Sequence, residues 1–269
     1  MSSRRCSTLI PLRSSKTVTL LVIAFLPVSL SAQTAAKGDP QAVAILNQTL
    51  AVTGWASPPN DVVAQATVTQ VKGEQPVIHT VTWKARGADA LRIEVDTPDG
   101  RVTTVRNGSR GVHSQGTRND RLTGHAAATT HSIQFPFLLL TALVSEPSAE
   151  ITYRGTESVN GENVHVIELR TRQNLDNPND SLSQAWRFVL YVSTGTLLPV
   201  RLDYSRLGAD NSNVVLHCNR FFSDYKRLGA FLVPYQQSDF VEGRKVAEIQ
   251  FTQVQLNTGV SPSEFDVAN

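Results

Sequence analysis

Apolar and polar side chains alternate along the chain from residue 186 to residue 256. The clearest run puts four apolar side chains on one face of a strand: Leu198, Val200, Leu202 and Tyr204. A period of two is typical of a strand that has one face in an apolar environment and the other in water. Turns at residues 194–196, 207–211 and 228–229 separate successive strands. The pattern predicts a curved antiparallel sheet that presents an extended surface. Such a surface favours a binding function over a catalytic one.

The first third of the chain predicts one helix followed by an antiparallel meander. Between Gln41 and Val52, apolar residues recur at helical spacing, and Gly54 follows where a C-terminal cap is expected. Four strands are predicted next, at residues 61–72, 77–86, 91–96 and 101–106, with turns between them. The stretch from residue 115 to residue 130 is polar and has no period, so we expect a loop there.

A second helix is predicted from Ile133 to Val144. Pro136 suits its first turn, and the segment is apolar on nearly all sides. Such a helix must be buried, either in a core or against a ligand, since it is too short to span a bilayer.

Strands resume after this helix, at residues 150–155 and 163–171, and a polar surface loop is expected at residues 173–183. In the last strand, from Lys245 to Leu256, the apolar face changes between Phe251 and Val254. A change of face within one strand predicts a β-bulge or a sharp bend.

The N-terminus has the parts of a secretory signal peptide, which we assign to residues 1–32. Basic residues precede an apolar run from residue 18 to residue 30, and small residues follow it. The run is shorter than the roughly 20 residues of a membrane span. We therefore expect an exported, periplasmic protein, with an uncleaved anchor as the alternative. Residues 33–39 are assigned to a linker and residues 40–269 to a single domain.

The leader also accounts for the basic charge of the chain. The whole sequence has a net charge of +2, whereas without residues 1–32 there are 21 Lys and Arg against 23 Asp and Glu, a net charge of −2. The basic pI is therefore no indication of nucleic-acid or anionic-membrane binding. Cys218 is the only cysteine beyond the leader, so we expect no internal disulfide and a stability that depends on the core.

Motifs of catalysis and cofactor binding are not found in the sequence. The six histidines share no metal-ligand spacing on one element, so no bound metal is expected. The Gly-Ser-Arg-Gly stretch at residues 108–111 lies in a predicted hairpin turn and lacks the spacing of a nucleophile elbow. Phosphate loops are missing, and aromatic residues do not alternate with basic ones as on nucleic-acid platforms. We expect a protein that is not an enzyme and has no cofactor or nucleic-acid partner.

Large apolar side chains that face a curled sheet are then the best candidates for a ligand-binding surface. The candidate set is Trp83, Ile133, Phe137, Leu140, Val144, Trp186, Phe188, Leu202 and Tyr204. Taken alone, each of them is explained better as an ordinary core residue. A sheet of about ten strands tends to curl, and its concave side is either filled by side chains or hollow enough for an apolar ligand. The sequence leaves both arrangements open.

Short motifs in the second half of the chain resemble those of a known family. They are Thr194-Gly195-Thr196 followed by Leu198-Pro199, Phe222-Ser223-Asp224-Tyr225, Gly229 with Val233-Pro234, and Asn257 followed by Phe265. With the two predicted helices between strands, they are similar to features of outer-membrane lipoprotein-sorting proteins, the lipoprotein-carrier (LolA/LolB-like) superfamily. The resemblance covers roughly residues 40–265.

The resemblance implies a mainly β protein with helices (α+β), in which a curved antiparallel sheet forms a half-open β-barrel covered by two or more helices. It also implies a function: an exported carrier or binder of lipid or lipoprotein acyl chains, with envelope membrane proteins as further partners and the helices as a lid. The alternative hypothesis is an envelope protein–protein interaction module with a filled barrel. A hydrolytic enzyme is the third hypothesis, for which no nucleophile and base can be paired.

Overall fold

The computed structural model describes residues 38–72, 75–122, 134–170, 187–207 and 214–267. The predicted signal peptide, nearly all of the predicted linker and the predicted loop at residues 173–183 lie outside these ranges. So do two of the candidate residues, Ile133 and Trp186.

Two α-helices and one short 3₁₀-helix are described. They are α1 (Pro40–Thr53), α3 (Pro136–Ser145) and η1 (Pro262–Phe265). Asp39 caps α1 by accepting a 2.8 Å hydrogen bond from the backbone N–H of Gln41. Gly54 ends the helix in the left-handed conformation, with φ of 81°. Both predicted helices are confirmed, and Pro136 lies in the first turn of α3 as expected.

All of the described strands belong to one antiparallel sheet. The strands are β1 (Val62–Lys72), β2 (Gln75–Arg86), β3 (Ala90–Thr97), β4 (Gly100–Asn107), β5 (Arg110–Gln115), β6 (Arg118–Arg121), β7 (Glu150–Val159), β8 (Glu162–Arg170), β9 (Arg187–Ser193), β10 (Pro199–Leu207), β11 (Val215–Leu228), β12 (Phe231–Val241) and β13 (Arg244–Leu256). Their order across the 13-stranded sheet is β6-β5-β4-β3-β2-β1-β13-β12-β11-β10-β9-β8-β7.

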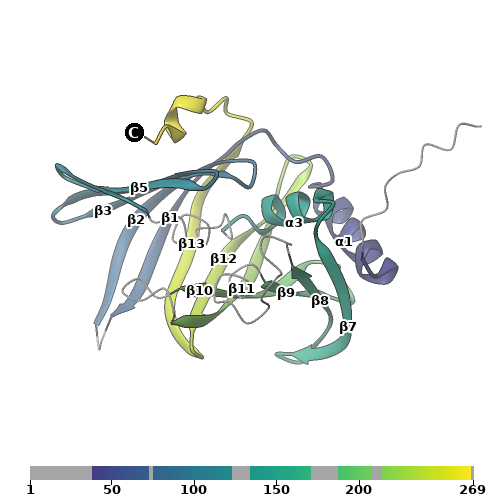
Figure 1. Cartoon of the computed structure of the whole chain (residues 1–269). Helices are drawn as coiled ribbons and strands as arrows, with labels where there is room; N and C mark the ends of the chain where they lie inside the picture. Colours follow the sequence, from purple (N-terminus) through teal and green to yellow (C-terminus); the bar gives the residue numbers. More distant parts are fainter. Residues whose placement is uncertain (1–37, 73–74, 123–133, 171–186, 208–213, 268–269) are drawn as a thin grey trace, which may run out of the picture. The chain divides into compact units, whose positions relative to one another are not determined.

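This order describes two meanders joined at one seam. The strands β1 to β6 run outward from the middle of the sheet, and β7 to β13 return from the opposite edge until β13 pairs with β1. The sheet is strongly curved, and because β6 and β7 lie at its two edges it does not close (Figure 1). The predicted fold class, a curved antiparallel sheet with helices in a half-open barrel, is confirmed.

One prediction was wrong at the start of the expected loop. Residues Arg118–Arg121 form strand β6, which pairs with β5 in the register Gln115↔Arg118 to Val112↔Arg121. Gly116 allows the tight turn between them, with φ of 59°. This edge strand buries neither face, so its sequence needs no apolar period, and the alternation that revealed the other strands is lacking.

The predicted change of face in the last strand is a β-bulge. Gln65 pairs with Gln253 while the next residue, Ala66, pairs with Phe251, so Thr252 is the extra residue. Its hydroxyl donates a 3.1 Å hydrogen bond to the carbonyl oxygen of Gln65. The bulge bends the sheet at the seam between the two meanders.

The hydrophobic core lies between the helices and one side of the sheet, which we call the concave face; the opposite side is the outer face. Figure 1 shows α1 and α3 side by side, with the sheet curving round α3. Trp55, in the turn after α1, stacks on Phe137 of α3 with 5.2 Å between ring centroids. One cluster of buried residues includes both helices and strands of both meanders.

Candidate functional site

The candidate residues that the structure describes all lie in this core cluster. Trp83, Phe137, Leu140, Phe188 and Leu202 are buried, and the half-buried Val144 and Tyr204 pack against them. The register shows how strands bring them together: Leu190 of β9 lies opposite Leu202, and Phe188 lies opposite Tyr204. Opposite residues of an antiparallel pair share one face. Sequence alternation therefore identified strand residues of an apolar floor under the two helices.

Helix α3 is held on this floor chiefly by apolar contact. Phe137 lies edge-on to Tyr225 with 6.5 Å between ring centroids. Just before the helix, Phe135 stacks on Phe251 at 5.9 Å. Two side-chain hydrogen bonds join the segment to its surroundings: Gln237 Nε2 donates to the carbonyl oxygen of Gln134 at 2.8 Å, and Thr141 Oγ1 donates to that of Trp55 at 3.3 Å.

A buried ion pair interrupts the apolar floor, and sequence reasoning missed it. Arg220 of β11 lies opposite Leu202 and Asp239 in the register, on the concave face. Its Nε and Nη2 donate to the two carboxylate oxygens of Asp239 at 2.6 and 2.5 Å, and its side chain is 3% exposed. Burial lowers the pKa of the Arg220 guanidinium, but the Asp239 charge outweighs this effect and raises it. The signal in the sequence was an arginine two residues from Cys218 and from Phe222.

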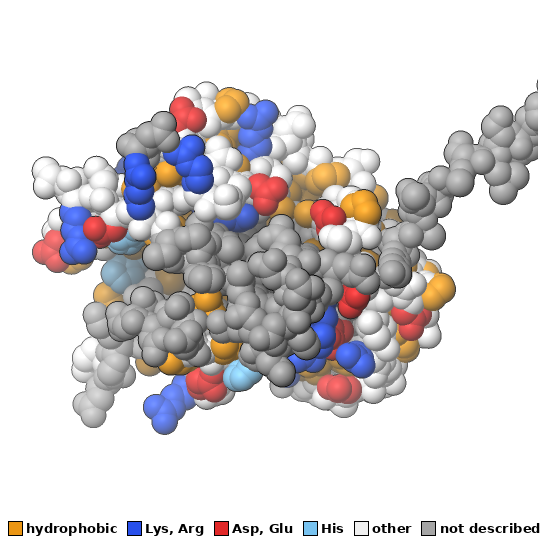
Figure 2. Space-filling view, in the orientation of Figure 1, with side chains coloured by type: hydrophobic (Ala, Val, Ile, Leu, Met, Phe, Trp, Pro, Cys, Tyr) orange, Lys and Arg blue, Asp and Glu red, His pale blue; other side chains and the backbone are white. Residues whose placement is uncertain are grey.

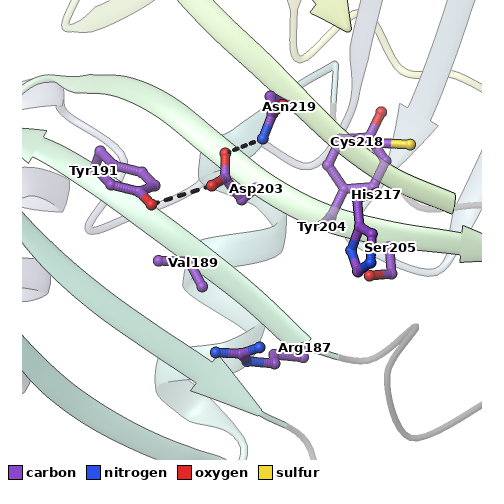
Figure 3. A pocket seen from close by; sticks show the side chains of 9 residues that line it. All are labelled: Arg187, Val189, Tyr191, Asp203, Tyr204, Ser205, His217, Cys218 and Asn219. Carbon is purple, nitrogen blue, oxygen red and sulfur yellow. Dashed lines mark hydrogen bonds between the residues drawn. The ribbon is translucent and has the colours of Figure 1, made fainter. Parts of the chain in front are cut away.

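The outer face carries a polar groove of about 270 Å³ across β9, β10 and β11 (Figure 3). Asp203 is its centre, since it accepts hydrogen bonds from the Tyr191 hydroxyl at 3.1 Å and from Asn219 Nδ2 at 2.7 Å. Burial, followed by the charge of Asp203, raises the pKa of Tyr191 to about 12. At neutral pH this hydroxyl is a hydrogen-bond donor and not a base.

A wider groove of about 650 Å³ lies beside it, between the β7–β8 turn and the outer face of β10 to β12. Phe221 and Phe240 meet edge to face in its floor with 5.5 Å between centroids. The guanidinium of Arg201 lies over two rings, 4.7 Å from the centroid of Tyr191 and 5.5 Å from that of Phe221. Aromatic rings and arginine together are typical of residues that carry binding energy at protein interfaces.

Near the β7 edge, three arginines surround one buried glutamate. Arg154, Arg170 and Arg187 donate to the carboxylate of Glu168, whose side chain is 3% exposed. Burial raises the pKa of Glu168, but hydrogen bonds from Arg187 and Arg154 outweigh it and lower the pKa to about 2. The carboxylate is therefore charged and fully paired at neutral pH, which suits a structural role.

The described residues do not contain a group of three or more His, Cys, Asp and Glu side chains that could hold a metal ion. Burial raises the pKa of the Cys218 thiol, which makes it a poor nucleophile. Neither described α-helix has the length and apolar character that a membrane span requires. Figure 2 shows basic and acidic side chains interspersed over the face in view.

Comparisons with known proteins identify the fold. No family model and no curated protein matches the sequence. Among solved structures, an outer membrane lipoprotein-sorting protein domain from Vibrio parahaemolyticus and a DUF1329 family protein from Desulfovibrio piger are each 14% identical, with a TM-score of 0.58, over 84% of this chain and 96% of theirs. A LolA superfamily protein from Nitrosomonas europaea is 10% identical, with a TM-score of 0.56, over 84% of this chain and 97% of its own. The chain therefore has the fold of the LolA-like outer membrane lipoprotein-sorting proteins.

Proposed function

We propose that the protein is an exported, non-enzymatic carrier or binder of acyl-chain ligands in the periplasm. The observation that carries the proposal is helix α3, which has apolar side chains on nearly all sides and lies on an apolar floor. Lipid and lipoprotein acyl chains are the partners that such a surface would take. The motifs of the sequence and the shared fold with lipoprotein-sorting proteins support the same function.

The physical basis is the exchange of one apolar surface for another. Hydrophobic contact is non-directional, so an acyl chain can replace the side chains of α3 on the concave face without a new set of hydrogen bonds. Each CH₂ group removed from water contributes about 0.8 kcal/mol, so a long chain can displace a short helix. Only two side-chain hydrogen bonds tie the described α3 segment to its neighbours, so the free-energy cost of displacing it is low.

The first test is uptake of an apolar fluorescent probe by the mature domain, with mass spectrometry of an organic extract of the gently purified protein. In Phe137→Ala the helix loses its stack on Trp55. We expect this variant to bind the probe about threefold or more tightly, because a larger fraction of the molecules has an open floor.

The matched control for this test is Phe265→Ala. Phe265 is also buried, at 1% exposed, but it lies in η1 against β3 and β4, outside the core cluster. Both substitutions cost about 3–5 kcal/mol of stability. Equal probe affinity in the two variants, or a wild-type protein that neither takes up the probe nor carries lipid, would contradict the proposed function.

The outer face supports a second candidate function, an envelope protein–protein interaction module. Its observation is the groove in which Arg201 lies over the rings of Tyr191 and Phe221. Lipid-free protein should then bind one stoichiometric envelope protein, and Arg201→Ala should weaken that binding by about tenfold or more. If the substitution leaves the affinity for the partner unchanged, the groove does not contribute to partner binding.

A further inference from the structure

Several buried polar atoms on the concave side of the sheet and next to α3 have no hydrogen-bond partner. Within the described residues they include His79 Nδ1, Trp83 Nε1, Gln134 Oε1, Arg220 Nη1 and Gln237 Oε1. Nearly all buried polar groups of native proteins are paired, because an unpaired one loses its hydration without compensation. A set of unpaired donors and acceptors on one surface therefore points to a polar group of a ligand.

Two of these residues are close enough to act on one group. Arg220 lies opposite Asp239, and Gln237 precedes Asp239 by two residues on the same face of β12. The backbone positions of such diagonal neighbours lie about 7–8 Å apart, which is within reach of long side chains such as Arg and Gln. A single amide group offers a carbonyl acceptor and an N–H donor, each with a hydrogen bond of about 3 Å, so it can pair with one polar atom of each side chain.

The two residues also offer complementary chemistry. Asp239 occupies Nε and Nη2 of Arg220, so the N–H groups on Nη1 remain as donors. Gln237 uses its Nε2 on the carbonyl oxygen of Gln134, so its Oε1 remains as an acceptor. The buried side chains around them, Leu202 and Phe222, are apolar and suit an acyl chain.

We propose that Arg220 and Gln237 form the polar subsite of the acyl-binding floor, and that its ligand is an acyl chain joined through a secondary amide. The inference rests on the proposed carrier function. The Arg220 Nη1 group donates to the amide carbonyl oxygen, and Gln237 Oε1 accepts from the amide N–H. An ester carbonyl can accept the hydrogen bond from Arg220, but an ester has no N–H group to donate to Gln237. A free carboxylate brings an uncompensated charge into a buried site, because Asp239 already neutralises Arg220.

The test compares four pyrene-labelled probes of equal chain length: the alkane, the methyl ester, the free acid and the N-methyl amide. For the wild-type mature domain we expect the amide to bind about tenfold more tightly than the alkane, since two added hydrogen bonds are worth about that factor. The ester should fall between them, and the acid should bind less tightly than the ester.

Two variants locate the preference. Arg220→Met combined with Asp239→Leu removes both charges together, and should bind ester and amide no better than the alkane while alkane affinity is kept. Gln237→Leu also removes the hydrogen bond to Gln134, so the probes are compared within this variant: the amide should bind no better than the ester, while the ester should keep its advantage over the alkane. This variant replaces the double variant if that protein does not fold. The control is Arg101→Met combined with Asp96→Leu, an exposed Arg–Asp pair with an Nε–Oδ1 distance of 2.8 Å.

The outcomes separate this inference from the proposed function. If the alkane binds and the amide binds no better, or if the variants keep the preference, the subsite is overturned and the carrier function stands. If no probe binds the wild-type protein, both are overturned.

Discussion

Glu168 shows how one buried charge can link the stability of the sheet to pH. Its folded-state pKa of about 2 lies below the ordinary value of 4.5. A lowered pKa means that the charged form stabilises the fold fully above about pH 4.5, and that this stabilisation is lost as the pH falls towards 2. The ion pairs with Arg154, Arg170 and Arg187 are thus strongest at neutral pH.

We therefore expect Glu168→Gln to lower the free energy of unfolding on the order of 2 kcal/mol at pH 7, a figure reduced because the three arginines are partly exposed. The difference between wild-type and variant proteins should shrink towards zero near pH 2. Urea titrations of both proteins across this range measure it. A difference that stays constant with pH would show that the contribution of Glu168 does not depend on its charge.

At the scale of elements, the end of α1 leaves no room for a side chain at Gly54. A Cβ atom on Gly54 would lie 2.2 Å from the carbonyl oxygen of Ala230, in the turn between β11 and β12, and its φ is +81°. The helix cap and the docking of α1 on the sheet thus depend on the same missing side chain.

Gly54→Ala should destabilise the protein by more than about 2 kcal/mol, because the backbone strain and the clash add. Gly161 provides the comparison, since it also has a positive φ, of +83°, but nothing lies within 4 Å of its Cβ position. We expect Gly161→Ala to cost about 1 kcal/mol. Thermal unfolding of the two variants measures the gap, and equal losses would mean that the contact with Ala230 is relieved by a backbone shift.

Individual elements show what the sequence could and could not predict. A local period of apolar residues marks the strands with one buried face and the two helices. A break in that period marks the bulge at Thr252. Strand β6 has no such period, because it buries neither of its faces. The Arg220–Asp239 pair escaped for another reason: it depends on a register between two strands, and no local pattern states which residues lie opposite. The same holds for the pairing of β1 with β13.

At the scale of the whole molecule, the seam between β1 and β13 joins residues far apart in the sequence. Asp61, just before β1, accepts hydrogen bonds from the Thr258 backbone N–H at 2.8 Å, its hydroxyl at 2.7 Å and the Gly259 N–H at 3.0 Å. Burial raises the pKa of Asp61, but these hydrogen bonds outweigh it and lower the pKa. The carboxylate thus joins the first meander to the end of the second.

Asp61→Ala should lower the free energy of unfolding by about 2–3 kcal/mol, since it removes several charge-assisted hydrogen bonds at once. We expect most of the loss to appear as faster unfolding, because contacts between distant parts of a chain tend to form late in folding. Stopped-flow folding and unfolding rates over a range of urea concentrations measure the division. Slower folding with an unchanged unfolding rate would place the seam in the folding nucleus instead.

The order of the strands has one more consequence. Strand β6 lies at one edge of the sheet and β7 at the other, and α3 lies between them in the sequence. Helix α3 is thus the described element that connects the two open edges of the sheet along the chain. If an acyl ligand displaces α3, amide hydrogen exchange should rise together in β6 and β7, so this measurement follows ligand entry at both edges at once.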